Sequence, residues 1–256
     1  MVALGDHSRV ELGVWPTPLT PSPLLAQALE RDVLWTKRDD LSGFSWGGNK
    51  VRAEDLAGRL AADRALTGEA PYVIPRGGAS DVGTLGFLAA AIELERQADL
   101  TEGVPTTIVL PVGSGGSAAG LIAGLARSER DWTVHAISVS RDPKTIEEVV
   151  VNLAARCAAS VGIDLTPADI QRRLFVHDGR GPGFGELSTD IAVLADRVEA
   201  ATGLLIDPTY NAKTLAWMHA ANPGGLSPDR PILYWHTGGV LGSVDRMLST
   251  SEPVTS

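Results

Sequence analysis

Residues 106–125 constrain the fold more than any other stretch of this 256-residue chain. They read TTIVLPVGSGGSAAGLIAGL, which is an apolar run of strand length, a glycine-rich turn and a run of small residues typical of a helix over 118–126. Glycines let the backbone turn sharply and approach a ligand closely, and a helix N-terminus carries unpaired N–H groups with a partial positive charge. The pattern predicts an anion site, most often for phosphate, formed by Gly113, Ser114, Gly115, Gly116 and Ser117. A tight turn that binds no ligand is the alternative interpretation.

Strands and helices alternate along most of the chain, and short glycine turns join them. We expect strands near 33–37, 106–112, 134–139, 175–177 and 232–235, and helices near 24–29, 82–95, 118–126, 144–161, 167–174 and 186–202. This order predicts an α/β fold with a parallel sheet covered by helices on both faces. Ligands bind such sheets at the carboxyl ends of the strands. One site is therefore expected to collect Ser114, Tyr210 and Thr237, each of which follows an expected strand.

Composition narrows the class of protein. The net charge of −9 argues against nucleic acid or an anionic membrane surface as the main partner. Cys157 is the single cysteine, and the histidines lack the spacing of metal ligands, so we expect neither a disulfide nor a metal site. The N-terminal residues lack a signal pattern, and no apolar run is long enough to span a bilayer. We therefore expect a cytoplasmic protein that does not act at a membrane.

Lys50 stands in an unusual local sequence, GFSWGGNKVR at residues 43–52. It follows two glycines and Asn49, and it is expected to open a helix, where its charge opposes the helix dipole. A lysine in an apolar pocket loses its proton more easily and becomes a nucleophile that forms a Schiff base with an aldehyde cofactor. Most lysines are simply surface residues. Pyridoxal 5'-phosphate, however, requires both an amine and a phosphate cradle, and this chain offers both.

Six motifs in order closely resemble the D-cysteine desulfhydrase and 1-aminocyclopropane-1-carboxylate deaminase family: GGNK, IPRGGAS, VGSGGSAAGL, GPGFG, DPTYNAK and HTGG. The resemblance runs over residues 10–248. It implies a pyridoxal-phosphate enzyme of the tryptophan synthase β-like fold (fold type II) that acts as a lyase on a small amino acid. It also leads us to expect a homodimer.

The resemblance assigns roles to individual residues. Lys50 resembles the Schiff-base lysine, and Asn49 lies beside it against the cofactor. Residues 113–117 resemble the phosphate loop, with Ser117 where the family usually has threonine. Tyr210 matches the active-site tyrosine. Thr237 matches the group that faces the pyridine nitrogen in the desulfhydrases.

The chain also departs from this family. Relatives carry several tens more residues between the lysine helix and the IPRGGAS strand, and that block holds a GG-x-Q-SNH motif with acid/base and substrate-binding roles. We expect residues 1–50 and 75–256 to form the large cofactor-binding domain and residues 51–74 to be the remnant of a truncated small domain. Phe184 stands where tyrosine is common. Asn211 stands where deaminases carry a glutamate, which makes β-elimination the better expectation.

Two other functions remain open at this stage. A catalytically impaired relative that at most binds the cofactor is favoured by the missing motif and by Phe184 and Asn211. A nicotinamide-dependent oxidoreductase is a remote alternative, because Gly113, Gly115 and Ala118 fit the dinucleotide fingerprint. The next expected strand, however, ends in Ser-Val-Ser-Arg at 138–141 and offers no acid for the ribose hydroxyls.

Overall fold

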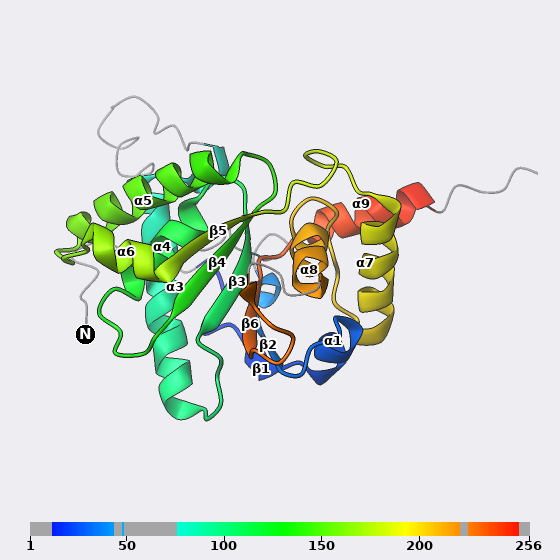
Figure 1. Ribbon diagram of the computed structural model, residues 1–256, viewed down its shortest axis with the longest axis horizontal. Coiled ribbons are helices and arrows are strands. Elements are labelled where there is room, and N and C mark those ends of the chain that lie inside the picture. The colour runs from blue at the N-terminus through cyan, green and yellow to red at the C-terminus, as the bar shows by residue number, and fades with distance from the viewer. Residues whose placement is uncertain (1–11, 44–47, 49–75, 221–224, 251–256) are drawn as a thin grey trace, which may run out of the picture.

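The computed structural model describes residues 12–43, 48, 76–220 and 225–250. Asn49, Lys50 and the expected remnant at 51–74 lie outside the described residues. In the described part, one sheet has the strand order β1-β2-β6-β3-β4-β5 (Figure 1). Its strands are β1 (Leu19–Pro21), β2 (Leu34–Arg38), β3 (Thr107–Val112), β4 (Thr133–Ser138), β5 (Leu174–Asp178) and β6 (Ile232–His236).

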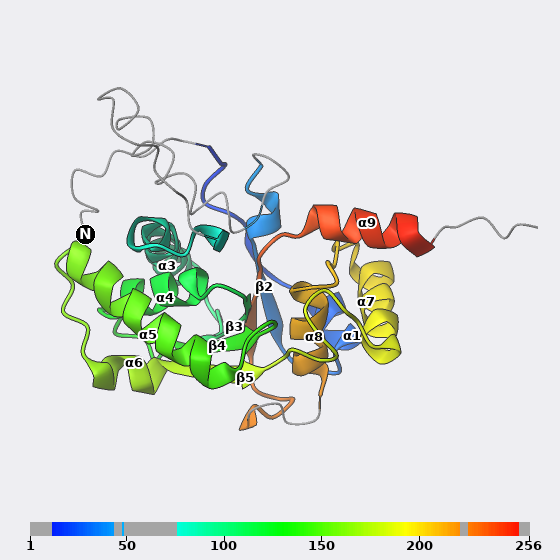
Figure 2. The same cartoon turned by 90° about the horizontal axis from the view of Figure 1, so that it is seen from above.

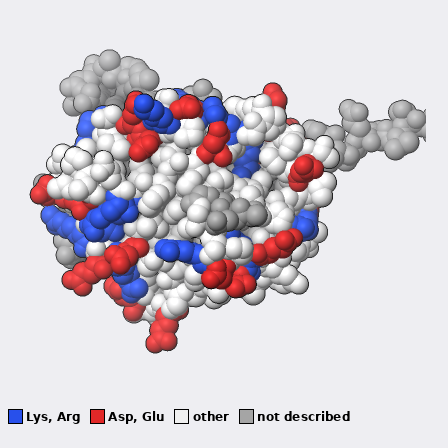
Figure 3. Space-filling view, viewed as in Figure 1, with Lys and Arg blue, Asp and Glu red and all other residues white. Residues whose placement is uncertain are grey.

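Helices cover both faces of this sheet. Those on one side are α3 (Asp81–Leu100), α4 (Gly116–Gly124), α5 (Pro143–Ser160) and α6 (Pro167–Arg173). Those on the other are α1 (Pro23–Ala28), α7 (Thr189–Thr202), α8 (Asn211–His219) and α9 (Val240–Thr250) (Figures 1 and 2). None of the helices in the described ranges has the length and apolar character needed to cross a membrane. Acidic and basic side chains lie interspersed on the face shown in Figure 3.

Strand β3 lies between two hydrophobic cores on opposite faces of the sheet, and all of its residues are buried. Ile108 and Leu110 point into the core that contains α3 and α4, whereas Val109 points into the core that contains α7 and α8. Successive side chains of a strand face opposite sides, so a strand covered on both faces needs a continuous apolar run. The TIVLPV sequence meets this requirement, which explains why residues 106–112 are readable as a buried strand.

The expected parallel sheet is confirmed for five strands. β2, β6, β3, β4 and β5 pair in parallel, so their carboxyl ends meet at one edge. β1 is an antiparallel addition next to β2. Residues 204–208, which precede Tyr210, are not a strand. The expectation that Tyr210 follows a strand is therefore wrong, and Tyr210 reaches the carboxyl edge from a loop.

Candidate active site

A cavity of about 630 Å³ opens at the carboxyl ends of β3, β4 and β6. This volume lies within the range of small-molecule sites. The residues that line it come from six separate stretches of the chain: Gly77, Pro111–Ser117 without Gly116, Ser140 with Arg141, Phe184, Asp207 with Tyr210, and Thr237 with Gly238 and Gly239. The structure thus brings Ser114, Tyr210 and Thr237 to one site, as the sequence predicts.

The glycine turn after β3 forms one wall of this cavity. Gly113, Ser114, Gly115 and Ser117 line it, and Gly116 is the first residue of α4. The N-cap of α4 is Gly115, which has no side chain to cap the helix. A Cβ added at Gly113 would lie 3.0 Å from Cε1 of Tyr210, so the backbone here runs close to the tyrosine ring. A glycine turn with an uncapped helix start is a suitable donor set for phosphate.

Asp207 fixes the turn that carries Tyr210. Its Oδ2 accepts the backbone N–H groups of Thr209 and Tyr210 at 3.0 and 2.8 Å, and its Oδ1 accepts that of Asn211 at 3.0 Å. Burial raises the pKa of Asp207, while these N–H donors favour its charged form. The ring of Phe184 meets the Tyr210 ring edge-on, with centroids 6.2 Å apart. Asp207 therefore holds the backbone of the turn from which Tyr210 reaches the cavity wall.

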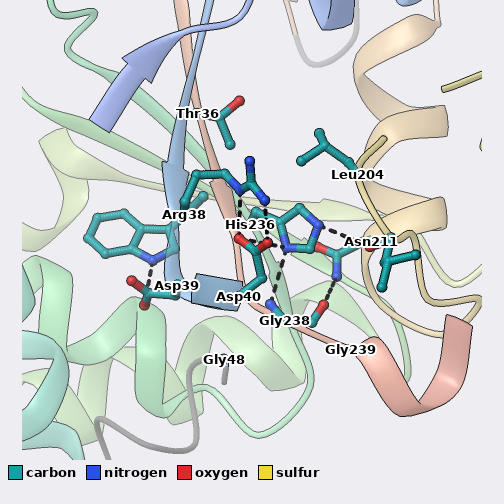
Figure 4. A network of polar contacts seen from close by, with 12 residues as sticks. Thr36, Arg38, Asp39, Asp40, Gly48, Leu204, Asn211, His236, Gly238 and Gly239 are labelled. Carbon is teal, nitrogen blue, oxygen red and sulfur yellow. Dashed lines mark hydrogen bonds and ion pairs between the residues drawn. The ribbon is translucent and has the colours of Figure 1, made fainter. Parts of the chain in front are cut away.

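Two side chains hold the Gly238 peptide next to Thr237 (Figure 4). The backbone N–H of Gly238 donates to Nδ1 of His236 at 3.2 Å, and Nε2 of His236 donates to the carbonyl of Leu205 at 3.1 Å. Burial lowers the pKa of His236, which keeps the imidazole neutral. On the other side, Nδ2 of Asn211 donates to the Gly238 carbonyl at 2.5 Å. The turn that presents Thr237 is therefore held at both the N–H and the carbonyl group of Gly238.

Asn211 is fully buried and does not line the cavity. Its Nδ2 also donates to Oδ1 of Asp207 at 2.6 Å, and its Oδ1 accepts the hydroxyl of Tyr234 at 2.5 Å. Both the nitrogen and the oxygen of the Asn211 carboxamide are therefore hydrogen-bonded to buried protein groups. The position at which deaminases carry a glutamate therefore supplies no acid to this cavity.

Asp39 is a site-supporting residue that the sequence analysis missed. The charged sequence Arg38-Asp39-Asp40 looks like an exposed turn, but Asp39 is completely buried. Its carboxylate accepts the Thr17 hydroxyl at 2.9 Å and the Trp235 indole N–H at 2.8 Å. Burial of this carboxylate is compensated by these donors. Its place directly after β2, at the edge where ligands bind, was the available signal.

Gly48 connects this region to the cavity. Its N–H donates to the Asp39 carbonyl at 2.7 Å and to the Ser42 hydroxyl at 3.0 Å. Its φ is +98°, and a Cβ would lie 2.7 Å from the Thr237 carbonyl oxygen, so only glycine fits. The chain two residues before Lys50 therefore lies against the turn that presents Thr237. Asn49 and Lys50 themselves lie outside the described residues.

A family model described as "Pyridoxal-phosphate dependent enzyme" matches residues 47–238. The chain therefore belongs to the family of pyridoxal-phosphate-dependent enzymes. This result removes the nicotinamide-dependent alternative. It also agrees with the chemistry of the cavity, in which the glycine turn is suited to a phosphate group.

Individual relatives show which members of the family this chain is similar to. A Pyrococcus abyssi protein with the provisional name 1-aminocyclopropane-1-carboxylate deaminase is 35% identical, with 93% of this chain and 94% of the relative covered. D-cysteine desulfhydrase of Salmonella newport is 32% identical over 74% of this chain and 55% of its own. A crystal structure of an ACC deaminase homologue, 25% identical, superimposes with a TM-score of 0.80 over 96% of this chain and 97% of that chain. The expected α/β fold is thereby confirmed.

The Pyrococcus abyssi alignment extends over 316 residues, which is more than the 256 residues of this chain. The relative therefore has internal residues without a counterpart here.

Within the described part of the chain, no group of three or more His, Cys, Asp or Glu side chains is arranged to hold a metal ion.

Proposed function

We propose that this chain is a pyridoxal-phosphate-dependent lyase that acts on a small amino acid by β-elimination, in the manner of a D-cysteine desulfhydrase. The observation that carries the proposal is the composition of one cavity. It combines the glycine turn at the start of α4 with Tyr210 and Thr237, and Gly48 lies against Thr237 two residues before Lys50.

The residues present fit the cofactor. The backbone N–H groups of the glycine turn and the start of α4 would hold its phosphate, and the Thr237 hydroxyl would face its ring. Lys50 would bind it covalently. Two residues of chain span at most about 7 Å, so connectivity keeps Lys50 near Gly48 and hence near Thr237. Asn49 is the neighbouring residue proposed to contact the cofactor.

Bound pyridoxal phosphate supplies an electron sink for the carbanion that forms at the α-carbon of an amino acid. The chain's own groups would handle the protons. The Lys50 amine would take the proton from the α-carbon of the substrate. Tyr210 lies on the cavity wall, where Asp207 accepts its backbone N–H and Phe184 packs against its ring, and its hydroxyl would assist the departing group.

The deaminase activity named for one relative is the weaker candidate for this chain. The carboxamide of Asn211 is buried and bonded to Tyr234, Asp207 and Gly238. It cannot donate a proton to a ring in the cavity. This observation favours an elimination that proceeds with the neutral hydroxyl of Thr237 beside the ring.

We also propose that residues 51–74 are what remains of a small domain and that the rest of the chain forms the cofactor-binding domain. The internal residues that the Pyrococcus abyssi relative has in excess support this division. The described residues on either side of the segment lie at the site, because Gly48 adjoins Thr237 and Gly77 lines the cavity. We also propose a homodimer, in which the second subunit would cover the side of the site where the small domain is shortened.

A catalytically impaired relative is the second candidate. Among the described residues that line the cavity, Asp207 is the one with a carboxyl or imidazole side chain. Its oxygens already accept hydrogen bonds from three backbone N–H groups and the Asn211 carboxamide. Such a protein would bind the cofactor and turn over no substrate.

One experiment separates these candidates. Purified protein and Lys50→Ala are loaded with pyridoxal phosphate, and the absorption of lysine-bound cofactor is recorded together with release of sulfide from D-cysteine. The lyase predicts absorption and sulfide release that both disappear in Lys50→Ala. Absorption without turnover identifies the impaired relative, and absence of both contradicts the assignment of this cavity to the cofactor.

A further inference from the structure

We propose that Arg141 is the cationic group of an oxyanion subsite in this cavity, and that it binds the cofactor phosphate or the carboxylate of the amino-acid substrate. The identity of these ligands rests on the proposed function. The subsite itself follows from three observations on the described residues: where Arg141 lies, how its backbone is held, and which other cations at this edge are already paired.

Arg141 lies next to the glycine turn. β3 and β4 are parallel neighbours with Val112 opposite Ser138, and the Val139 N–H donates to the Val112 carbonyl at 3.1 Å. The turn after β4 therefore runs beside the turn after β3. Both turns line the same cavity, to which Ser140 and Arg141 contribute from the β4 side.

The backbone of Arg141 is anchored. The hydroxyl of Ser138, which is fully buried, donates to the Arg141 carbonyl at 2.7 Å. The next residue, Asp142, is the N-cap of α5 and accepts the Lys144 N–H at 3.0 Å. The position from which the Arg141 side chain starts is therefore set by a buried strand end and by a helix cap.

Other arginines at this edge already have acidic partners. Arg180 makes a bidentate pair with Asp178, with Nε to Oδ1 at 2.9 Å and Nη2 to Oδ2 at 2.6 Å. Arg38 pairs with Asp40 in the same way, at 2.8 and 2.6 Å. No ion pair joins the Arg141 guanidinium to an acid in the described ranges. It is also the one Lys or Arg among the described residues that line the cavity.

An arginine that lines a cavity and pairs with no acid in the described ranges suits an oxyanion. Its planar donor fork matches carboxylate and phosphate, and such charge-assisted hydrogen bonds are stronger than neutral ones. The chain as a whole carries a net charge of −9, so it repels anions except where local groups attract them. The glycine turn provides backbone N–H dipoles for one anionic group, and Arg141 adds the full positive charge that those dipoles lack.

The test compares Arg141→Gln with Arg180→Gln, which removes the same charge from the same edge but from a paired arginine. Inorganic phosphate and pyridoxal phosphate are titrated into each protein. D-alanine is then titrated into the cofactor-loaded proteins, with the absorption of bound cofactor as readout. Arg141→Gln is expected to weaken binding about tenfold, and Arg180→Gln to stay within about twofold of wild type. Arg141→Lys should restore part of the loss.

The probes identify the source of the oxyanion. Weaker binding of phosphate and pyridoxal phosphate assigns Arg141 to the cofactor phosphate, and weaker binding of D-alanine alone assigns it to the substrate carboxylate. Equal effects of Arg141→Gln and Arg180→Gln on all three probes overturn the proposal, as does a wild-type protein that binds none of them. If phosphate binding depends on Arg141 but Lys50 does not take up the cofactor, the proposed function fails and the subsite stands.

Discussion

Asn211 is one of the two residues that hold the Thr237 turn. Its carboxamide joins α8 to the end of β6 by donating to Gly238 and Asp207, while Tyr234 from β6 donates to its oxygen. Because all these groups are buried, an unpaired member would cost more free energy than one lost hydrogen bond suggests.

Replacing Asn211 with Asp tests this role. The ionised carboxylate cannot donate, so the Gly238 carbonyl loses its partner and the new charge faces Asp207. We expect the free energy of unfolding to fall by about 3 kcal/mol in chemical denaturation. Tyr234→Phe is the control, since it removes one donor and leaves Gly238 bonded, and should cost about 1 kcal/mol. A smaller loss for Asn211→Asp than for Tyr234→Phe would contradict the clamp.

The sequence predicts the position of those site residues that belong to a recognisable local motif. The glycine turn, Tyr210 and Thr237 follow recognisable motifs, and the structure places them around one cavity. Asp39 was missed because its burial depends on Thr17 and Trp235, which are remote in sequence. The roles of Lys50 and Asn49 stay predictions.

The packing of α3 on α4 is the clearest feature at the scale of elements. A Cβ at Gly120 of α4 would lie 2.5 Å from the Thr84 carbonyl oxygen and from Cβ of Phe87, both on α3. The two helix backbones therefore approach more closely than any side chain at this position allows. Small residues in α4 permit this contact, and they explain the GSAAGLIAG sequence of the helix.

Gly120→Ala is expected to be destabilising, although alanine favours a helix by about 1 kcal/mol over glycine. The added methyl group must push α3 and α4 apart, which we expect to outweigh that gain and to lower the free energy of unfolding by about 2 kcal/mol. Thermal unfolding of the variant against wild type measures the sign. A melting temperature equal to or above that of wild type would show that the helices are not in close contact.

A histidine pair links β4 to β5. Nδ1 of His135 lies 3.0 Å from Nε2 of His177, and both rings pack with Trp217. Burial, then His177 and Arg230, lowers the pKa of His135 to about 3. The unfolded chain therefore takes up a proton on this residue at a higher pH than the folded protein does.

This difference predicts acid sensitivity. The stabilisation that neutral His135 provides is complete above about pH 6.5 and is lost as pH falls from there towards 3, by up to about 1.4 kcal/mol per pH unit. His135→Leu removes this contribution. Denaturation curves of wild type and variant should differ in their pH dependence below pH 6.5 and run parallel above it. Parallel curves at all pH values would exclude the pair as a source of acid sensitivity.

Most helices and strands could be predicted because each has its own hydrophobic periodicity and characteristic residues at its ends. The predicted helix at 144–161 corresponds to α5, which begins at Pro143 after an Asp142 cap, and the predicted strand at 134–139 corresponds to β4. β1 was not predicted, because a three-residue strand that ends in Pro21 depends on its pairing with β2. Residues 204–206 are apolar, as a buried strand would be, but they do not belong to the described sheet.

At the scale of the whole molecule, the strand order explains why distant motifs form one site. β6, the last strand in sequence, pairs with β2 and β3 in the middle of the sheet. This insertion brings the Thr237 turn next to both the glycine turn and Gly48. Local sequence patterns cannot reveal the order of strands in a sheet. The six motifs can indicate it, because they resemble one family and thereby imply that family's fold.

The central claim is that Lys50 and the glycine turn hold one pyridoxal phosphate. The most direct measurement is to incubate the protein with pyridoxal phosphate, reduce it with borohydride and map the modified lysine by mass spectrometry of peptides. We predict a single label on Lys50, which excess inorganic phosphate diminishes because it competes for the glycine turn. Label on any other lysine, or no label at all, would contradict the account.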